Sequence, residues 1–343
     1  MKKVMVGMSG GVDSSVAAYL LKSEGYEVIG VTLKLCGENS GDIEDAKRVA
    51  KKIGIEHVSV DLSEEFRNKV INSFVDSYKN GETPNPCITC NKHIKFGDML
   101  DFALESGMDF VATGHYANVV NTQDNRRLLL KSADASKDQT YFLYSLTQEQ
   151  LSHVIFPLGN LSKDQVRKIA EEQGFVNARK RDSQDICFVP GGDYASFIEK
   201  YTGINFPIGD FVDTNGKKLG EHKGIIKYTV GQRKGLGIAL GKPAFVCAKN
   251  VDSNTVVLGE NKDLFSMELI ADNVNLIPFD KIDEPIRVGA KIRYNQKEQP
   301  ALVESIGEGA VRVVFDEPQR AVSKGQSVVF YSGNSVVGGG IIR

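Results

Sequence analysis

Hydrophobic and polar positions follow two different patterns in the two parts of the chain. Up to about residue 180, short apolar runs alternate with amphipathic stretches, and a glycine often stands where an amphipathic stretch ends. Short apolar runs are typical of buried strands, amphipathic stretches of helices, and glycine of the position just past a helix. The expected strands are 3–8, 27–33, 57–62 and 109–114, with helices over 14–24 and 42–53. This order predicts a parallel sheet built from βαβ units.

From about Phe206 the pattern changes to short alternating runs. The turn dipeptides Asn215-Gly216 and Ser332-Gly333 separate such runs. This spacing predicts small antiparallel barrels or sandwiches. A further change near residues 267–270 indicates two such units. We therefore expect three domains, with bounds 1–203, 204–268 and 269–343.

Composition and charge limit the classes of protein to which the chain can belong. Its 343 residues include five cysteines, too few for a disulfide scaffold, and no apolar run reaches the roughly 18 residues of a membrane span. The N-terminus lacks the apolar core of a secretory signal, so we expect a cytoplasmic protein with no membrane partner. The formal net charge of −2 argues against a globally basic surface for nucleic acid. An RNA partner would have to be held locally.

A glycine-rich turn, SGGVDS at residues 9–14, joins the first predicted strand to the first predicted helix. Glycines at this junction let backbone N–H groups surround phosphate oxygens, and the helix N-terminus adds its positive dipole end. The turn is neither a Walker A loop nor G-x-G-x-x-G. Without a lysine to stabilise a transferred γ-phosphoryl group, it suits a β,γ-pyrophosphate that leaves while the α-phosphorus is attacked. Asp13 is a candidate Mg²⁺ ligand, and Ser9 and Ser14 are candidate hydroxyl donors to phosphate.

Two cysteine segments are candidates for a second kind of chemistry. Cys87 and Cys90 form a C-x-x-C just before an amphipathic helix that we expect to open around Ile94. Cys187 follows the cationic run at residues 179–181. A thiol near a helix N-terminus or beside cations has a stabilised thiolate, as a sulfur nucleophile requires. In a reducing compartment a C-x-x-C is more typical of metal binding or redox chemistry than of a plain disulfide.

Seven motifs follow one another along the chain: GMSGGVDSSVAA, TPNPCITCNKHIKF, ATGHYA, KDQTYFL, DSQDICF, YTVGQRKGLGI and RY-Q. The SGGxDS string resembles the PP-loop ATP pyrophosphatases. The full set resembles the tRNA-specific 2-thiouridylases, the MnmA/TrmU family, over essentially the whole chain. The resemblance implies a PP-loop α/β domain, a small central β-rich domain that binds tRNA, and a C-terminal antiparallel β-barrel. It also implies that ATP adenylates O2 of the wobble uridine (position 34) of tRNA, that sulfur displaces AMP at C2, and that pyrophosphate is released.

The resemblance further assigns roles to residues that match the family motifs. It implies that Cys90 is the nucleophile and that Cys187 carries a persulfide. It implies ATP contacts for Gly7, Met8, Ser9, Gly10, Gly11, Val12, Asp13, Ser14, Leu33 and Gly114. It implies tRNA contacts for Asn85, Pro86, Cys87, His115, Lys137, Asp138, Gln139, Arg293, Tyr294 and Gln326. Such a site requires the base to leave its stack and a cationic rim to follow the anticodon stem.

One position departs from the family pattern. Where the family usually has N-P-D-x-x-C-N, this sequence has Cys87 in place of the aspartate. In the simplest scheme a cysteine desulfurase or relay protein loads Cys187, the persulfide attacks C2, and a Cys90–Cys187 disulfide releases the product. Cys87, Cys90 and Cys187 also match the three ligands of a 4Fe-4S cluster whose open iron would take up sulfide. Both routes stay open, and zinc is less favoured because no fourth ligand is adjacent.

The other cysteines have no predicted role. Cys247 has the setting of a strand-core thiol, and Cys36, which follows the second strand, is expected to be a bystander. His115 follows a strand end, where open α/β sheets bind ligands, which favours a functional role.

Three rival functions compete with thiolation of the wobble uridine. A PP-loop ligase that activates a carboxylate for attack by an amine would use the loop but give no role to Cys90 or Cys187. Thiolation of a different RNA base would use both features. A non-catalytic RNA-binding protein or iron–sulfur redox sensor would leave the SGGVDS loop unexplained.

Overall fold

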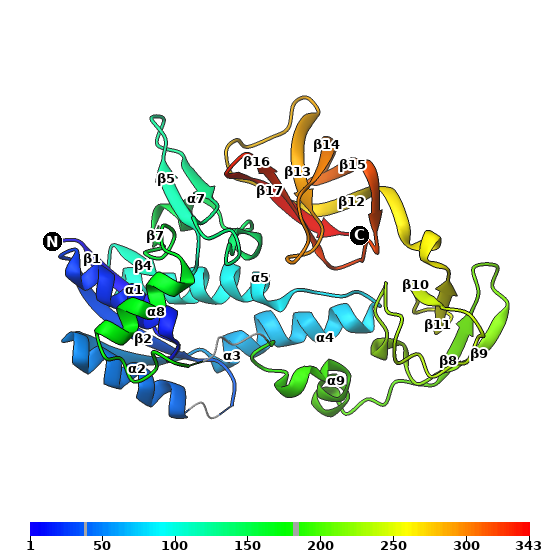
Figure 1. Ribbon diagram of the computed structural model, residues 1–343, viewed down its shortest axis with the longest axis horizontal. Coiled ribbons are helices and arrows are strands. Elements are labelled where there is room, and N and C mark those ends of the chain that lie inside the picture. The colour runs from blue at the N-terminus through cyan, green and yellow to red at the C-terminus, as the bar shows by residue number, and fades with distance from the viewer. Residues whose placement is uncertain (38–39, 181–184) are drawn as a thin grey trace.

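The computed structural model describes residues 1–37, 40–180 and 185–343, and Figure 1 shows three β-structures formed by them. A parallel sheet lies at one end of the molecule, a small central sheet lies at the other, and a barrel packs above the segment between them in that view. The predicted fold class is confirmed, whereas the exact division at residues 203 and 268 stays a prediction. Residues 181–184, which include the start of the DSQDICF motif, lie outside the described residues.

The first sheet has five parallel strands in the order β3-β2-β1-β4-β7. The middle of β1 is buried, as expected for an apolar run at the centre of a parallel sheet. The strands that the sequence predicts appear within two residues of their predicted bounds. They are β1 (Lys3–Gly7), β2 (Glu27–Lys34), β3 (Glu56–Asp61) and β4 (Phe110–Ala112), and β7 (Val154–Ile155) completes the sheet.

Helices cover both faces of this sheet. One face carries α1, α2 and α8, which share an apolar core with β1, β2 and β4, and the other carries the helical segment that contains the C-x-x-C. The helices are α1 (Val12–Ser23), α2 (Ser40–Ile53), α3 (Ser63–Phe66), α4 (Asn72–Lys79), α5 (Pro86–Cys90), α6 (Met99–Glu105), α7 (Gln148–Ser152), α8 (Lys163–Glu172) and α9 (Tyr194–Thr202). The other helical segments are the π-helical η1 (Arg67–Ile71) and η2 (Asn91–Asp98) and the 3-10 turns η3 (Thr140–Phe142) and η4 (Pro190–Gly192). No helix among the described residues is long and apolar enough to cross a membrane.

The central sheet has four strands in the order β10-β11-β8-β9. Its elements are β8 (Gly209–Val212), β9 (Lys218–His222), η5 (Ile225–Lys227), β10 (Phe245–Asn250), β11 (Thr255–Gly259) and η6 (Asn261–Leu264). β8 and β11 pair in parallel, so the prediction of purely antiparallel units was wrong for this sheet. Parallel neighbours need a long connection, and residues 223–244 provide it between the two hairpins.

The last six strands form a closed barrel in the order β12-β15-β14-β13-β16-β17, and β12 pairs with β17 to complete the ring. The strands are β12 (Phe265–Leu276), β13 (Ile286–Lys291), β14 (Gln299–Gly307), β15 (Ala310–Arg320), β16 (Ser327–Ser332) and β17 (Ser335–Ile342). A hairpin of the first part, β5 (Asn118–Asn121) and β6 (Arg127–Leu130), reaches the barrel through the pairing of Leu130 with Ser335.

The first part and the barrel are joined through buried contacts. Tyr141 donates a hydrogen bond to the Ser327 carbonyl at 2.8 Å, and the Tyr144 hydroxyl lies 3.0 Å from the Ser327 hydroxyl. The Asn275 amide donates to the Tyr144 carbonyl at 2.7 Å. One apolar core contains Tyr141 and Tyr144 from the first part together with Tyr331 from the barrel. The barrel is therefore fixed against the parallel-sheet part.

Candidate active site

The nucleotide loop joins β1 to α1 at the carboxyl edge of the parallel sheet. Gly10 has a φ of +70°, and a Cβ there would lie 2.4 Å from the Asp42 carbonyl oxygen, so a larger residue does not fit. Gly11 is the N-cap of α1 and supplies no side-chain cap. The first N–H groups of a helix have no acceptor within the helix, so this end of α1 can receive an anion. The nucleotide contacts expected of residues 9–14 stay a prediction.

The two serines of the loop differ in what they contact. The Ser14 hydroxyl donates to the Gly11 carbonyl at 3.1 Å and accepts from the Ser9 N–H at 3.2 Å, so it shapes the loop from within. The Ser9 side chain is exposed. Of the two predicted hydroxyl donors to phosphate, Ser9 is therefore the better placed.

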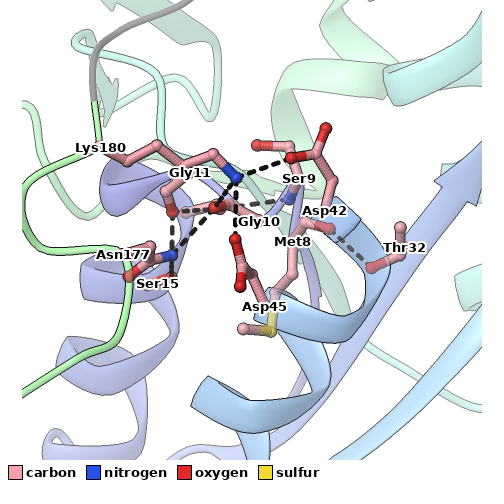
Figure 2. Close-up of polar contacts among 11 residues, drawn as sticks. Met8, Ser9, Gly10, Gly11, Ser15, Thr32, Asp42, Asp45, Asn177 and Lys180 are labelled. Atoms are coloured by element: carbon pink, nitrogen blue, oxygen red, sulfur yellow. Dashed lines mark hydrogen bonds and ion pairs between the residues drawn. The ribbon is translucent and has the colours of Figure 1, made fainter. Parts of the chain in front are cut away.

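Asn177, from the segment after α8, is hydrogen-bonded to the nucleotide loop (Figure 2). Its side-chain amide donates to the Gly10 carbonyl at 3.0 Å and to the Ser15 hydroxyl at 2.9 Å. Asn177 is buried, so losing these bonds would leave a backbone carbonyl without a partner in the interior. The nucleotide loop and the chain that leads to Cys187 are thus bonded to each other.

Lys180 adds charge to the same attachment (Figure 2). Its ammonium group donates to the Gly10 carbonyl at 3.2 Å and forms ion pairs with Asp42 at 2.7 Å and Asp45 at 2.9 Å. Both acids lie in α2, so this lysine joins the loop, α2 and the segment before Cys187. A lysine predicted to act as part of a cationic run beside Cys187 instead acts at the nucleotide loop.

Asp13 is already paired in this structure. The Lys163 ammonium group donates to both Asp13 carboxylate oxygens at 2.8 Å, and the Tyr116 hydroxyl donates to one of them at 2.8 Å. Lys163 is buried, so the pair is shielded from water. A carboxylate neutralised by an ammonium group is not arranged as a Mg²⁺ ligand, so the predicted magnesium role of Asp13 stays a prediction without support from this geometry.

Gly114, two residues after β4, lies against the loop, and its predicted place near ATP stays a prediction. A Cβ at this position would be 2.7 Å from both the Asp13 carbonyl carbon and the Ser14 nitrogen. Leu33 lies at the end of β2 and packs against the apolar cores on the C-x-x-C side. Gly114 therefore contacts the predicted nucleotide loop directly, whereas Leu33 lies along the same sheet edge.

The C-x-x-C lies inside a helix and not before one, so the predicted helix start near Ile94 was wrong. The helix begins at Pro86, and the Asn85 side chain caps it by accepting from the Cys87 N–H at 3.2 Å. It continues without a break through η2 into α6. Asparagine at the N-cap followed by proline is a common start, and that signal was present in the sequence. Cys87 and Cys90 thus occupy the first turn and a half.

The thiols have the opposite electrostatic setting from the one predicted. Cys90 is only 7% exposed, and burial raises its pKa to about 11. The pKa of Cys187 is also raised, first by its hydrogen bond with Cys36 and then by desolvation. That same hydrogen bond lowers the pKa of Cys36 to about 7. Neither pKa shift supports the predicted stabilised thiolates: at Cys90 burial, which the sequence does not reveal, outweighs the helix N-terminus, and at Cys187 the hydrogen bond with Cys36 is the larger cause and burial the second.

Lys95 is the cation that acts on these thiols. Its charge opposes the raised pKa values of Cys87, Cys90 and Cys187. It lies in η2, a little more than one turn after Cys90, and its side chain is partly buried. The Lys95 charge therefore favours the thiolate form at all three of these cysteines.

Replacing Lys95 with methionine is expected to raise the pKa of Cys90 and Cys187 further, because the ammonium group lowers both. Below the pKa the thiolate fraction falls tenfold for each unit of increase, so alkylation by iodoacetamide should slow by roughly threefold to tenfold at pH 8. Alkylation rates of individual cysteines, followed by peptide mass spectrometry, measure this. Lys92→Met is the control, because Lys92 lies on the same helix and acts on His93. Equal rates in both variants would contradict this role.

The cysteines predicted as cluster ligands are near one another but are not gathered into a metal site. A thiolate at Cys87 or at Cys187 would raise the pKa of Cys90, which indicates that the three cysteines lie in one neighbourhood. Among the described residues, no three His, Cys, Asp or Glu side chains are grouped closely enough to hold a metal ion. The five cysteines are free thiols. The 4Fe-4S cluster therefore stays a prediction that this arrangement does not favour.

His115 is packed and neutral. Its ring packs against those of Phe96 and Phe156, with centroids 5.9 and 6.0 Å away, and its Nδ1 lies 2.7 Å from the Thr113 hydroxyl. Desolvation lowers the pKa of His115 well below its ordinary value, so the ring carries no charge at pH 7. A contact of this histidine with tRNA would be made by a neutral ring.

A cavity of about 440 Å³ separates the loop at residues 134–139 from the barrel. Asp138 and Tyr294, both predicted to contact tRNA, line it with three lysines: Lys131, Lys291 and Lys297. The other two loop residues predicted to contact tRNA, Lys137 and Gln139, are not among the residues that line this cavity. The Gln139 side chain accepts from the Tyr116 N–H at 2.9 Å, and Lys137 is partly buried. The cavity brings cations and an aromatic ring together, as an RNA contact would need.

Arg293 and Gln326 hold parts of the chain together. The Arg293 guanidinium group donates to the Val230 carbonyl at 3.3 Å and the Ala321 carbonyl at 3.1 Å, which joins the central part to the barrel. The Gln326 amide donates to the Thr83 carbonyl at 2.6 Å, just before the C-x-x-C helix. Their predicted tRNA contacts stay predictions, and each has a structural role in addition.

Four residues of the site were not predicted: Lys95, Tyr116, Lys163 and Asn177. Lys95 and Tyr116 lie in the KHIKF and GHYA motifs, which were available signals. The contacts of Lys163 and Asn177 join residues 150 and 167 positions apart in the chain, and no local pattern indicates them.

Three family models together match nearly the whole chain. Family models described as the tRNA methyl transferase HUP domain, the tRNA methyl transferase PRC-barrel domain and the aminomethyltransferase beta-barrel domain match residues 2–191, 195–260 and 266–342. A solved U34-tRNA thiolase NcsA from Methanococcus maripaludis, with its [4Fe-4S] cluster, is 23% identical. It covers 59% of this chain and 65% of its own, and its TM-score of 0.36 is too low to support an argument.

Curated relatives agree with the motifs. A tRNA-specific 2-thiouridylase MnmA from Clostridioides difficile is 55% identical over 100% of this chain and 98% of its own length. A second tRNA-specific 2-thiouridylase MnmA, from Acetivibrio thermocellus, is 53% identical over 100% of this chain and 99% of its own length. The resemblance drawn from the sequence motifs is thereby confirmed. The chain belongs to the tRNA-specific 2-thiouridylase (MnmA) family, a family of tRNA sulfurtransferases.

Proposed function

We propose that this chain uses ATP to adenylate O2 of the wobble uridine (position 34) of tRNA, and that sulfur then displaces AMP at C2. One observation carries the proposal: Asn177 and Lys180 bond the nucleotide loop to the segment that leads to Cys187. ATP bound at the loop and sulfur carried on Cys187 would therefore meet at one edge of the sheet. Family membership supports uridine in tRNA as the substrate.

The loop supports release of pyrophosphate and not transfer of a phosphoryl group. Backbone N–H groups at the start of α1 would hold the β- and γ-phosphates, and Ser9 would add a hydroxyl. Uracil O2 attacks the α-phosphorus, which makes C2 electrophilic and turns its oxygen into part of a leaving group. In this step the chain binds and orients ATP, and Mg²⁺ would supply charge neutralisation when bound.

In the sulfur step, Cys187 accepts sulfur from a persulfide donor and its persulfide attacks C2 as AMP leaves. Cys187 is exposed, so a donor protein or a small persulfide can reach it. A second thiol must then break the bond between Cys187 and the transferred sulfur, and the family resemblance assigns this step to Cys90. Lys95 would favour the thiolates that both events require.

The tRNA side of the proposal uses the helix that starts at Asn85 and the cavity beside Tyr294. Uracil must leave its stack to reach Cys87 and Cys90, and the lysine-lined cavity would hold backbone phosphates. The ligase alternative would leave this arrangement without a role.

Oxygen transfer tests the first chemical step. With an unmodified tRNA transcript that carries ¹⁸O at O2 of uridine 34, the AMP released should gain ¹⁸O, because that oxygen stays on phosphorus. Nucleoside mass spectrometry of the same sample should place 2-thiouridine at position 34, and a transcript with guanosine 34 is the control. AMP formed without tRNA from a small carboxylate would support the ligase instead, and thiouridine at another position would support a different base.

A further inference from the structure

The carboxylate of Asp13 joins three segments that surround the nucleotide loop. Asp13 is the second residue of α1, Lys163 is the first residue of α8, and Tyr116 follows β4. The Lys163 ammonium group donates to both carboxylate oxygens at 2.8 Å, and the Tyr116 hydroxyl donates to one of them at 2.8 Å. The start of α1 is therefore tied to α8 and to the segment after β4 through one side chain.

Both partners of Asp13 are themselves fixed. Lys163 is 8% exposed and Tyr116 is 2% exposed. The Lys163 backbone N–H donates to the Asp134 carboxylate at 3.1 Å. The Tyr116 N–H donates to the Gln139 side chain at 2.9 Å, and the Gln139 N–H donates to the Tyr116 carbonyl at 3.0 Å. The backbone of both partners is thus held by the loop at residues 134–139.

The position of the Lys163 ammonium group limits what else the Asp13 carboxylate can bind. A cation chelated by a carboxylate lies near both oxygens, and the ammonium group already lies 2.8 Å from each. Mg²⁺ needs near-octahedral coordination, and an ammonium group at this distance would repel it. Moving Lys163 away would separate a buried ammonium group from this carboxylate, which is strongly destabilising. The donor set around Asp13 therefore does not fit a magnesium site.

The same pair fits a different task, which is to orient the end of α1. Gly11 is the N-cap and supplies no side-chain cap, so contacts from elsewhere in the chain orient this helix end. Asp13 makes such a contact within the first turn. The first N–H groups of this turn are the ones that would hold the phosphates of ATP, and their direction depends on how the helix end is held.

We propose that Asp13 is a positioning residue and not a ligand of Mg²⁺: its carboxylate, held by Lys163 and Tyr116, directs the first N–H groups of α1 toward the phosphates of ATP. The magnesium ion of MgATP is then bound by the phosphates, by water and by groups other than Asp13. The proposal rests on the ATP binding of the proposed function and assigns Lys163, which no sequence motif indicated, to the same task.

ATP binding at limiting and at saturating Mg²⁺ separates the two roles of Asp13. In Asp13→Asn the Kd for ATP, measured by isothermal titration, should rise at least about tenfold at both Mg²⁺ concentrations, because a hydrogen bond to a charged group is lost. Electron paramagnetic resonance of Mn²⁺ added with ATP should count the same number of bound ions per bound ATP in both chains. Asp164→Asn is the matched control, because Asp164 is the exposed acid next to Lys163 in α8. It should bind ATP like the unsubstituted chain.

A double variant keeps the test valid if Asp13→Asn does not fold. Asp13→Asn alone takes the carboxylate from a buried ammonium group, whereas Asp13→Asn with Lys163→Met removes both charges of the pair. The double variant should melt at a higher temperature than Asp13→Asn, and its Kd for ATP should be lower by at least about threefold. Its dependence on Mg²⁺ should match that of the unsubstituted chain, although position 13 then carries no carboxylate.

Three outcomes overturn the proposal: an unchanged Kd for ATP in Asp13→Asn, a dependence on Mg²⁺ or a Mn²⁺ count that changes when the carboxylate is removed, or a double variant as impaired as Asp13→Asn. Failure of the proposed function gives a different result. If the unsubstituted chain binds no ATP at either Mg²⁺ concentration, the use of ATP is wrong. If it binds ATP and one of the three outcomes occurs, only the role of Asp13 is lost.

Discussion

A chain with Cys187→Ser is expected to release pyrophosphate in the presence of tRNA and to make no 2-thiouridine. A serine hydroxyl cannot carry a sulfane sulfur, so thiolation should fall by at least about 1,000-fold, as for loss of a covalent nucleophile. The adenylation half should continue, because the contacts of Asn177 and Lys180 with the nucleotide loop do not use Cys187. Nucleoside mass spectrometry and a pyrophosphate assay on one sample measure both halves.

Cys247→Ser is the control for this experiment, because Cys247 is a half-buried thiol of β10 with no contact to the sulfur site in the described structure. Thiolation that survives in Cys187→Ser would show that sulfur reaches C2 by another route, such as an iron-bound sulfide. Loss of both thiolation and pyrophosphate release would instead mean that Cys187 supports the adenylation half.

Gly114→Ala is expected to weaken ATP binding strongly. The added Cβ would lie 2.7 Å from backbone atoms of Asp13 and Ser14, and backbone cannot turn aside as a flexible side chain can. The loop must shift, at a cost of about 1–3 kcal/mol, which corresponds to roughly a 5-fold to 150-fold increase in the Kd for ATP. Isothermal titration of ATP into the folded variant measures it.

Gly41→Ala provides the matched comparison, because Gly41 lies in α2 near the loop and a Cβ there meets nothing within 4 Å. Its ATP affinity should be unchanged, and its helix should be slightly more stable. An unchanged Kd in Gly114→Ala would mean that ATP does not use the loop as arranged here.

The alternation of strands and helices predicted the parallel sheet because each segment carried its own signal. Glycines past the helices, such as Gly25 and Gly54, marked ends that the structure keeps. The parallel pairing of β8 with β11 was missed, because strand order depends on where a long connection returns and not on any local pattern. The helix start at Pro86 was missed, although asparagine followed by proline is a common N-cap signal and was present at Asn85-Pro86.

The motifs named the residues of the predicted site, whereas the electrostatic setting expected for its thiols differs from the one in the structure. Motifs name residues, but a pKa depends on burial and on neighbours that come from elsewhere in the chain. Cys90 is buried by the apolar cluster around it, and Cys36, from the segment after β2, packs against the same cluster. Lys163 likewise meets Asp13 across 150 residues. Contacts of this kind are properties of the tertiary structure.

The apolar core that Tyr141 and Tyr144 share with Tyr331 links the melting of the parallel-sheet part to that of the barrel. Neither part can open without exposing aromatic surface that the other covers. In a calorimeter the two should melt together, as a single cooperative transition. A fragment cut before β12 would leave that surface in water, where it favours aggregation, so the barrel cannot be shed to yield a smaller enzyme.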